Sequence, residues 1–176
     1  ISKSGAGKQL RLRAIVTRDT VDEKTLYKRA TLLRNDSIHG DFKGEVDYDL
    51  EHQALIINGT TVKIISTENP EDIDYTEYGI HNALIIDNTG AFRDERELSR
   101  HLTANGASQV LLTAPAKGIP NIVYGVNNDM IDLENTSIFS AASCTTNAIS
   151  PILEIIDKKF SINQGHIETI HSYTND

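Results

Sequence analysis

Short apolar runs, each about the length of one buried β-strand, alternate along this chain with segments of helical periodicity. Residues 10–18 (LRLRAIVTR) form the first run, and Leu26, Ala30 and Leu33 follow it at helical intervals. Later strand-like runs occur within residues 54–67, 82–90, 109–115, 121–126, 137–143 and 165–173. Because strands that alternate with helices pair in parallel, we predict an α/β fold with a doubly wound sheet.

Turn and cap residues predict where several elements begin and end. The Asn-Gly pair at 58–59 is the preferred two-residue turn of a β-hairpin. Thr20 and Glu23 have the spacing of a capping box at the start of a helix. Gly106 is placed to end a charged helix over residues 93–106.

Composition and charge narrow the class of protein. The chain has 176 residues, 39% of them hydrophobic, and a formal net charge of −8. The acidic balance argues against a nucleic-acid or anionic-membrane partner, and no apolar run approaches the ~18 residues that cross a bilayer. A single cysteine excludes an internal disulfide, so we expect a cytoplasmic protein.

The two ends of the sequence indicate part of a longer protein. The chain begins with Ile1, and its only methionine is Met130. It stops directly after a strand-like run, with no closing element. We therefore expect it to be the interior of a longer polypeptide.

The only cysteine, Cys144, lies among small residues and hydroxyls in SAASCTTNAIS (140–150) rather than among Leu, Ile and Val. An apolar helical pattern follows, so we expect a helix to start at or just after it. The free N–H groups and the dipole of that first turn favour the nucleophilic thiolate and can bind an oxyanion. His171 is the candidate base. From local pattern alone, a small core cysteine and a hydrogen-bonded strand histidine remain the commoner interpretation.

Longer stretches of the chain resemble the glyceraldehyde-3-phosphate dehydrogenase family. That family's active site contains Ser-Cys-Thr-Thr-Asn, and its catalytic histidine lies in a His-(Ala/Ser)-Tyr-Thr run. The chain has SAASCTTNAISP and, 27 positions after the cysteine, HSYTND. Further matches in family order are DSIHGDFKGEV (36–46), NTGAF (88–92), HLTANGASQVLLTAP (101–115) and VYGVN (123–127).

The resemblance covers residues 9–176 and implies two domains. Residues 1–143 would form a Rossmann-type NAD-binding domain that lacks its N-terminal strand and glycine-rich loop. Residues 144–176 would begin an α+β catalytic domain. The family also implies a homotetramer, a role in glycolysis and glucose metabolism, and no metal.

The resemblance implies catalytic roles for the residues that match family motifs. Cys144 would attack the aldehyde of glyceraldehyde 3-phosphate to form a thiohemiacetal, and His171 would take the proton. Hydride transfer to NAD would leave a thioester, which inorganic phosphate releases as 1,3-bisphosphoglycerate. Ser143 and Thr145 would contact the attacking phosphate. Thr174 and Asp176 would lie where the family holds the substrate's own phosphate and the nicotinamide ribose.

Cofactor contacts are implied in the same way. Asp19, at the end of the first strand-like run, would bind the adenosine ribose hydroxyls. The residues that would line the cofactor groove or lie beside the nicotinamide are Thr89, Gly90, Phe92, Thr113 and Ala114. NAD is the expected cofactor, and Arg18 beside Asp19 leaves NADP open.

The chain departs from the family pattern at several positions. Glu68 stands where many members have a basic residue near the adenine, which puts the adenine packing in doubt. Asn88 replaces the usual Ser or Cys before Thr-Gly, and Ala148 replaces a second cysteine. An arginine with which family members bind phosphate has no match here.

Three alternatives remain open. Erythrose-4-phosphate dehydrogenase uses the same cysteine and histidine, and pocket residues beyond Asp176 would separate it. A semialdehyde dehydrogenase is also thiol-dependent, but we would not expect it to carry this Thr-Thr-Asn run. A non-catalytic nucleotide-binding protein of the same fold would have no reason to keep both Cys144 and His171.

We predict that residues 1–176 alone bind NAD weakly or not at all, aggregate, and show no dehydrogenase activity. A dinucleotide site of this type holds the pyrophosphate on a glycine-rich turn after its first strand, which these residues do not contain. The absence of that strand also exposes the edge of its neighbour. Titration calorimetry measures the binding, and micromolar NAD binding by a soluble monomer of this length would contradict the prediction.

Overall fold

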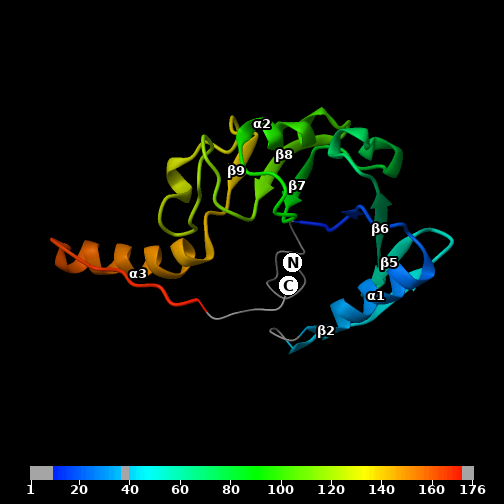
Figure 1. The fold of residues 1–176 in the computed structure, drawn as a ribbon, viewed down its shortest axis with the longest axis horizontal. Coiled ribbons are helices and arrows are strands. Elements are labelled where there is room, and N and C mark those ends of the chain that lie inside the picture. Colours follow the sequence, from blue (N-terminus) through cyan, green and yellow to red (C-terminus); the bar gives the residue numbers. More distant parts are fainter. Residues whose placement is uncertain (1–9, 37–39, 172–176) are drawn as a thin grey trace. The chain divides into compact units, whose positions relative to one another are not determined.

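The computed structural model describes residues 10–36 and 40–171. The chain divides into two compact units, residues 1–73 and 74–176 (Figure 1). Both units contain parallel strands connected through helical segments, which confirms the predicted α/β class. The predicted domain boundary between residues 1–143 and 144–176 stays a prediction.

The first unit is a sheet with one helix packed on it. The sheet contains, in spatial order, β1 (Ala14–Thr17), β6 (Thr60–Ser66), β5 (Ala54–Ile57) and β4 (Val46–Asp49). β1 and β6 are parallel, and the remaining neighbours are antiparallel. Helix α1 (Glu23–Arg34) buries Leu26 and Ala30 completely against this sheet. Smaller elements are β2 (Asn35–Asp36), β3 (Gly40–Asp41) and the 3₁₀ turn η2 (Pro70–Asp72).

Of two local predictions in the first unit, one is confirmed and one is wrong. The residues at 58–59 join β5 to β6 with φ values of 49° and 74°, as the hairpin turn requires. The capping box from Thr20 does not form. Helix α1 begins after Asp22, whose carboxylate accepts a hydrogen bond from the Thr25 N–H at 2.7 Å. An aspartate at this position satisfies the free N–H and places negative charge at the positive end of the helix.

The second unit contains a parallel three-stranded sheet, with the order β7 (Ala83–Asp87), β8 (Ala107–Leu112) and β9 (Ile138–Ser140). Its helical segments are η3 (Tyr75–Tyr78), α2 (Glu95–Leu98), η4 (Ser99–Thr103), η5 (Asn128–Met130) and α3 (Cys144–Phe160). The core of this unit consists of Leu98, Val110, Leu112, Ile119 and Ile138.

The charged helix predicted over 93–106 is divided in two. A single α-helical turn, α2, continues as the 3₁₀ segment η4. Leu98 ends α2 and His101 lies in η4, and both are buried because residues three apart lie on one side of either kind of helix. Gly106, with φ 89°, lies in the turn that leads into β8.

Two predicted strands are absent from the described residues. The run at 121–126 forms a loop, in which Asn121 makes one bridge to Ser140 and side-chain amides bind the loop backbone. Residues 162–171 have no regular secondary structure and are exposed, so a strand over 165–173 was wrong for its described part. A strand needs a partner for its backbone hydrogen bonds, and the described residues offer none to this segment.

Helix α3 confirms the helical pattern that follows the cysteine. It is continuous through Pro151, and none of its residues is buried. Residues of its predicted stripe are exposed, with Ile152 at 53% and Phe160 at 71% of their accessible surface.

Candidate functional site

The carboxyl ends of β7, β8 and β9 lie at one edge of their sheet because the strands are parallel. Backbone hydrogen bonds join the segments that leave them. The Thr113 N–H donates to the Asp87 oxygen at 2.9 Å, and the Ala141 N–H donates to the Leu112 oxygen at 2.8 Å. The predicted site residues in these segments are Thr89, Gly90, Thr113, Ala114, Ser143 and Cys144. Ligands of open α/β sheets bind at this edge.

Cys144 is the first residue of α3, as predicted, and Ser143 caps the helix. The Ser143 Oγ accepts a hydrogen bond from the Thr146 N–H at 2.9 Å. The cysteine side chain is exposed. The residue therefore lies in the first turn of the helix, where N–H groups without a partner inside the helix and the helix dipole favour an anion.

A three-residue segment with one left-handed residue carries the chain from β9 into α3. Ala142 has φ 59°, in the left-handed region that residues other than glycine rarely adopt. The buried Ser140 Oγ donates to the Ala114 oxygen at 2.6 Å and accepts from the Ala142 N–H at 2.9 Å. The Asn147 Nδ2 donates to the Ala141 oxygen at 2.7 Å. These contacts determine where the cysteine is presented.

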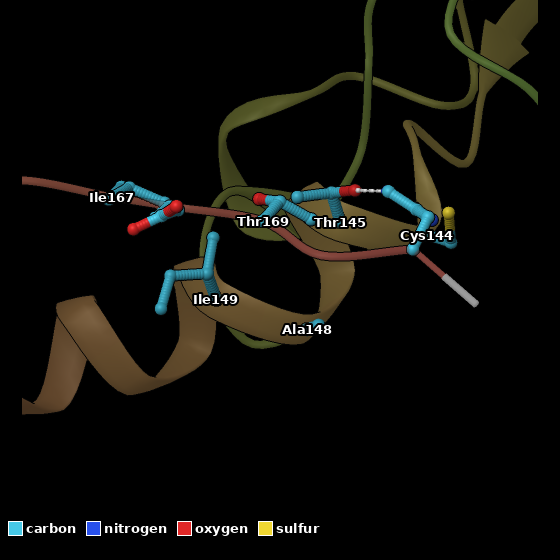
Figure 2. A pocket seen from close by; sticks show the side chains of 8 residues that line it. Cys144, Thr145, Ala148, Ile149, Ile167 and Thr169 are labelled. Carbon is cyan, nitrogen blue, oxygen red and sulfur yellow. Dashed lines mark hydrogen bonds between the residues drawn. The ribbon is translucent and has the colours of Figure 1, made fainter.

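Cys144 and His171 line one open pocket of about 390 Å³. The remaining lining residues are Thr145, Ala148, Ile149, Ile167, Glu168 and Thr169. Figure 2 shows Ile167 and Thr169 on the segment that passes the first turns of α3. Thr145 and Cys144 lie on that helix, and a dashed line marks a hydrogen bond from Thr145. That bond joins Thr145 Oγ1 to His171 Nε2 over 3.1 Å. Within the described residues, no hydrogen bond joins the Cys144 sulfur to the imidazole.

Two predicted site residues, Thr174 and Asp176, lie outside the residues that the structure describes. Within residues 10–36 and 40–171, no group of three or more His, Cys, Asp or Glu side chains is arranged to hold a metal ion. No helix in that part of the chain combines the length and apolar composition needed to cross a membrane.

A buried carboxylate organises the loop after β7. Asp87 is 2% exposed and accepts hydrogen bonds from the Thr89 N–H at 2.9 Å and the Thr89 Oγ1 at 2.8 Å. The His101 Nε2 donates to its other oxygen at 2.9 Å. Burial by itself raises the pKa of Asp87, but these hydrogen bonds outweigh it and hold the pKa below the ordinary 3.8. The Thr89 hydroxyl is thus directed toward the carboxylate.

The other two residues predicted in this loop differ in their surroundings. Gly90 has φ 72° with open space around its Cα, so its backbone conformation, rather than packing, favours glycine. Phe92 packs its ring edge against His101, with a centroid distance of 5.2 Å. The Arg100 guanidinium lies 5.4 Å from the Phe92 ring centroid. Phe92 therefore contributes to the core of the second unit as well as to the loop.

In the first unit, Asp19 lies just beyond the carboxyl end of β1, and its side chain is 68% exposed. Its Oδ2 lies 3.0 Å from the Arg29 Nη2. An accessible carboxylate at this end of a parallel strand is suited to accept hydrogen bonds from ribose hydroxyls.

Sequence reasoning assigned no role to five residues of this geometry: Arg29, Asp87, His101, Ser140 and Asn147. Asp87 did carry a signal, because a polar residue that ends a buried apolar strand of a parallel sheet lies at the ligand-binding edge. Asn147 carried a weaker one, since asparagine near a helix start often binds local backbone. The contacts of Arg29 and His101 join residues 10 and 14 positions apart and could be known only after folding.

Comparison with known proteins gives two family matches and a set of curated relatives. Residues 6–95 match the NAD binding domain of glyceraldehyde 3-phosphate dehydrogenase, and residues 143–176 match its C-terminal domain. A glyceraldehyde-3-phosphate dehydrogenase-like protein of Pseudomonas aeruginosa is 51% identical over 100% of the chain. Glyceraldehyde-3-phosphate dehydrogenases of Thermotoga maritima and Streptomyces coelicolor are each 40% identical, over 94% and 84% of the chain. The chain spans 38%, 47% and 43% of the lengths of these three relatives.

We predict that Asp87→Asn destabilises the protein by about 1–3 kcal/mol at neutral pH, because a buried acceptor of charge-assisted hydrogen bonds is lost. Since the folded pKa of Asp87 is below 3.8, its contribution is complete above that value and is lost as the pH falls through the lower folded pKa. Thermal melting of both full-length proteins should show a difference that narrows below about pH 3.8.

Asp132→Asn is the matched control, because this carboxylate also accepts hydrogen bonds but is exposed. It should change stability much less than Asp87→Asn. Equal effects of the two substitutions, or a difference for Asp87→Asn that is independent of pH, would contradict the prediction.

Proposed function

Because the chain belongs to the glyceraldehyde-3-phosphate dehydrogenase family, we propose that the protein oxidises glyceraldehyde 3-phosphate with NAD and inorganic phosphate to 1,3-bisphosphoglycerate. One observation carries the proposal. The exposed Cys144 belongs to the first turn of α3 and lines one pocket with His171. This arrangement supports a thiolate nucleophile with a base nearby.

The family assignment also confirms the predicted Rossmann-type NAD-binding domain and the presence of catalytic-domain residues. NAD is the cofactor that this domain binds. We propose that the catalytic domain begins at Cys144. The homotetramer and the cytoplasmic location expected from the sequence remain predictions.

We propose NAD contacts at predicted positions in each unit taken by itself. In the first unit, the open carboxylate of Asp19 can accept hydrogen bonds from the adenosine ribose hydroxyls. In the second unit, Thr89, Gly90 and Phe92 would line the cofactor groove, and Thr113 with Ala114 would lie beside the nicotinamide. Bound NAD supplies the hydride acceptor.

Cys144 would begin the reaction as a thiolate. His171 takes the thiol proton, and the sulfur forms a bond to the aldehyde carbon while the carbonyl electrons move to oxygen. The oxygen then gains that proton from His171, which gives a neutral thiohemiacetal and restores the base. The free N–H groups of the first turn of α3 stabilise the negative charge on that oxygen. His171 then takes the hydroxyl proton while hydride leaves the carbon, so that a thioester remains on Cys144.

Inorganic phosphate would complete the cycle. A phosphate oxygen attacks the thioester carbon, the carbon–sulfur bond breaks, and the Cys144 thiolate is restored with an acyl phosphate as product. We propose Ser143 and Thr145 as phosphate contacts. Both hydroxyls already have local partners, since Ser143 Oγ lies 2.6 Å from Thr146 Oγ1 and Thr145 contacts His171. Phosphate would share or replace these contacts.

We predict that Cys144→Ser abolishes NADH formation in the full-length protein but leaves NAD binding intact. His171→Asn should lower kcat by roughly 10²–10⁴-fold, because general-base assistance is lost. NADH absorbance measures turnover, and calorimetry measures binding. Turnover that survives Cys144→Ser would overturn the mechanism.

The substrate is tested in parallel with glyceraldehyde 3-phosphate and erythrose 4-phosphate. A higher kcat/KM for erythrose 4-phosphate would overturn the substrate assignment. NAD binding without oxidation of either aldehyde by the wild-type protein would indicate a non-catalytic nucleotide-binding protein.

We predict that Thr145→Ala slows steady-state turnover and raises the KM for phosphate while sparing the first-turnover NADH burst. Phosphate acts only at thioester release, whereas hydride transfer precedes it. Rapid-mixing kinetics separate the two steps, and Thr145→Ser, which keeps the hydroxyl, should retain both. A burst reduced as much as turnover would contradict the phosphate role and show that Thr145 acts through His171.

A further inference from the structure

Three side chains form a closed set of contacts at the carboxyl end of β1. The Arg29 Nη2 donates to Asp19 Oδ2 at 3.0 Å and to Thr17 Oγ1 at 2.5 Å. The Asp19 N–H donates to the same Thr17 hydroxyl at 3.1 Å. Arg29 therefore holds both the side chain of Asp19, directly, and its backbone, through Thr17.

The two charged partners differ in their exposure to solvent. The Arg29 side chain is 26% exposed, and its Nε is buried with no hydrogen-bond partner among the described residues. The Asp19 side chain is 68% exposed, and within the same residues its Oδ1 accepts no hydrogen bond. A largely buried cation thus orients an open carboxylate, with one oxygen held and the other available to a ligand.

The surroundings would favour an anion if Asp19 were absent. Asp19 and Arg29 line one pocket at the first turns of α1, and the remaining lining residues are Thr20, Asp22, Lys24, Thr25, Lys28 and Leu32. Of all eight lining side chains, three are cationic (Lys24, Lys28 and Arg29) and two are anionic (Asp19 and Asp22). Removal of the Asp19 carboxylate would leave Arg29 without its charged partner beside two lysines.

We propose that Arg29 is the positioning residue that sets the preference for NAD over NADP, an inference that rests on the proposed function. With Asp19 in place, Arg29 aims the carboxylate at the ribose hydroxyls, and the negative charge repels a 2′-phosphate. With Asp19 removed, the Arg29 guanidinium is the group that binds the 2′-phosphate. One arginine thus supports NAD binding through Asp19 and provides the latent NADP contact.

Dissociation constants of NAD and NADP, measured by calorimetry on the full-length protein, test the proposal. Arg29→Met should weaken NAD binding about tenfold, because Asp19 loses an orienting charge-assisted hydrogen bond, and should leave NADP binding weak. Arg29→Lys keeps the charge and should recover most of the lost NAD affinity. The effect should fall on the KM for NAD rather than on kcat, since Arg29 is assigned no part in the chemistry.

A second set of variants separates positioning from a loss of folding. Asp19→Ala should weaken NAD binding and strengthen NADP binding at least tenfold. Asp19→Ala/Arg29→Met should lose that gain in NADP affinity. Asp19→Ala/Arg18→Met is the matched control, because Arg18 is exposed and adjacent to Asp19, and it should keep the gain.

The outcomes distinguish this inference from the proposed function. Wild-type protein that binds neither nucleotide overturns both. Wild-type protein that prefers NADP, or NAD affinity unchanged in Arg29→Met, overturns the role of Arg29 while leaving the dehydrogenase assignment intact. A gain in NADP affinity that survives in Asp19→Ala/Arg29→Met but disappears in Asp19→Ala/Arg18→Met assigns the 2′-phosphate contact to Arg18 and overturns the proposal.

Discussion

The buried hydroxyl of Ser140 holds the segment between β9 and α3 on which the position of Cys144 depends. It donates to the Ala114 oxygen after β8 and accepts from the N–H of Ala142. The left-handed conformation of Ala142 costs on the order of 1–2 kcal/mol for a residue with a side chain. The conformation persists because these hydrogen bonds stabilise it, together with the bond from the Asn147 side-chain amide in α3 to the Ala141 oxygen. The candidate nucleophile is therefore positioned by the sheet as well as by its helix.

At the same edge of the sheet, the buried carboxylate of Asp87 also finds hydrogen-bond donors nearby. Asp87, at the end of β7, uses both carboxylate oxygens for Thr89 and His101, so the loop after the strand is held by a buried charge. A partly buried group in the first unit works in a comparable way, since Arg29 holds Asp19 at the end of β1. In each case a residue on a helical segment fixes the loop that follows a strand. This division suits ligand binding, because the loop can present polar groups without losing its conformation.

Much of the secondary structure was predictable because its signals are local. The hairpin at 58–59 follows from an Asn-Gly pair that accepts positive φ, and α3 follows from a small polar cap before an apolar stripe. The capping box failed because Asp22 competes with Thr20 for the same helix start. The runs at 121–126 and 165–173 have strand-like composition, but a strand also needs a hydrogen-bonding neighbour. That neighbour is a tertiary property. The run at 121–126 meets β9 at a single bridge, and the described part of the run at 165–173 pairs with no strand.

By itself, the sequence determined the α/β class, the family and the identity of the candidate site residues. Short motifs and apolar periodicity suffice for this because they depend on neighbouring residues alone. Only the tertiary structure decided which residues meet. It brought Thr145 to His171 across 26 positions and His101 to Asp87 across 14, and it exposed the thiol at the start of α3. The His101–Asp87 bond is buried and the Thr145–His171 bond is exposed, but both join segments that only the folded chain brings together, which a linear pattern does not contain.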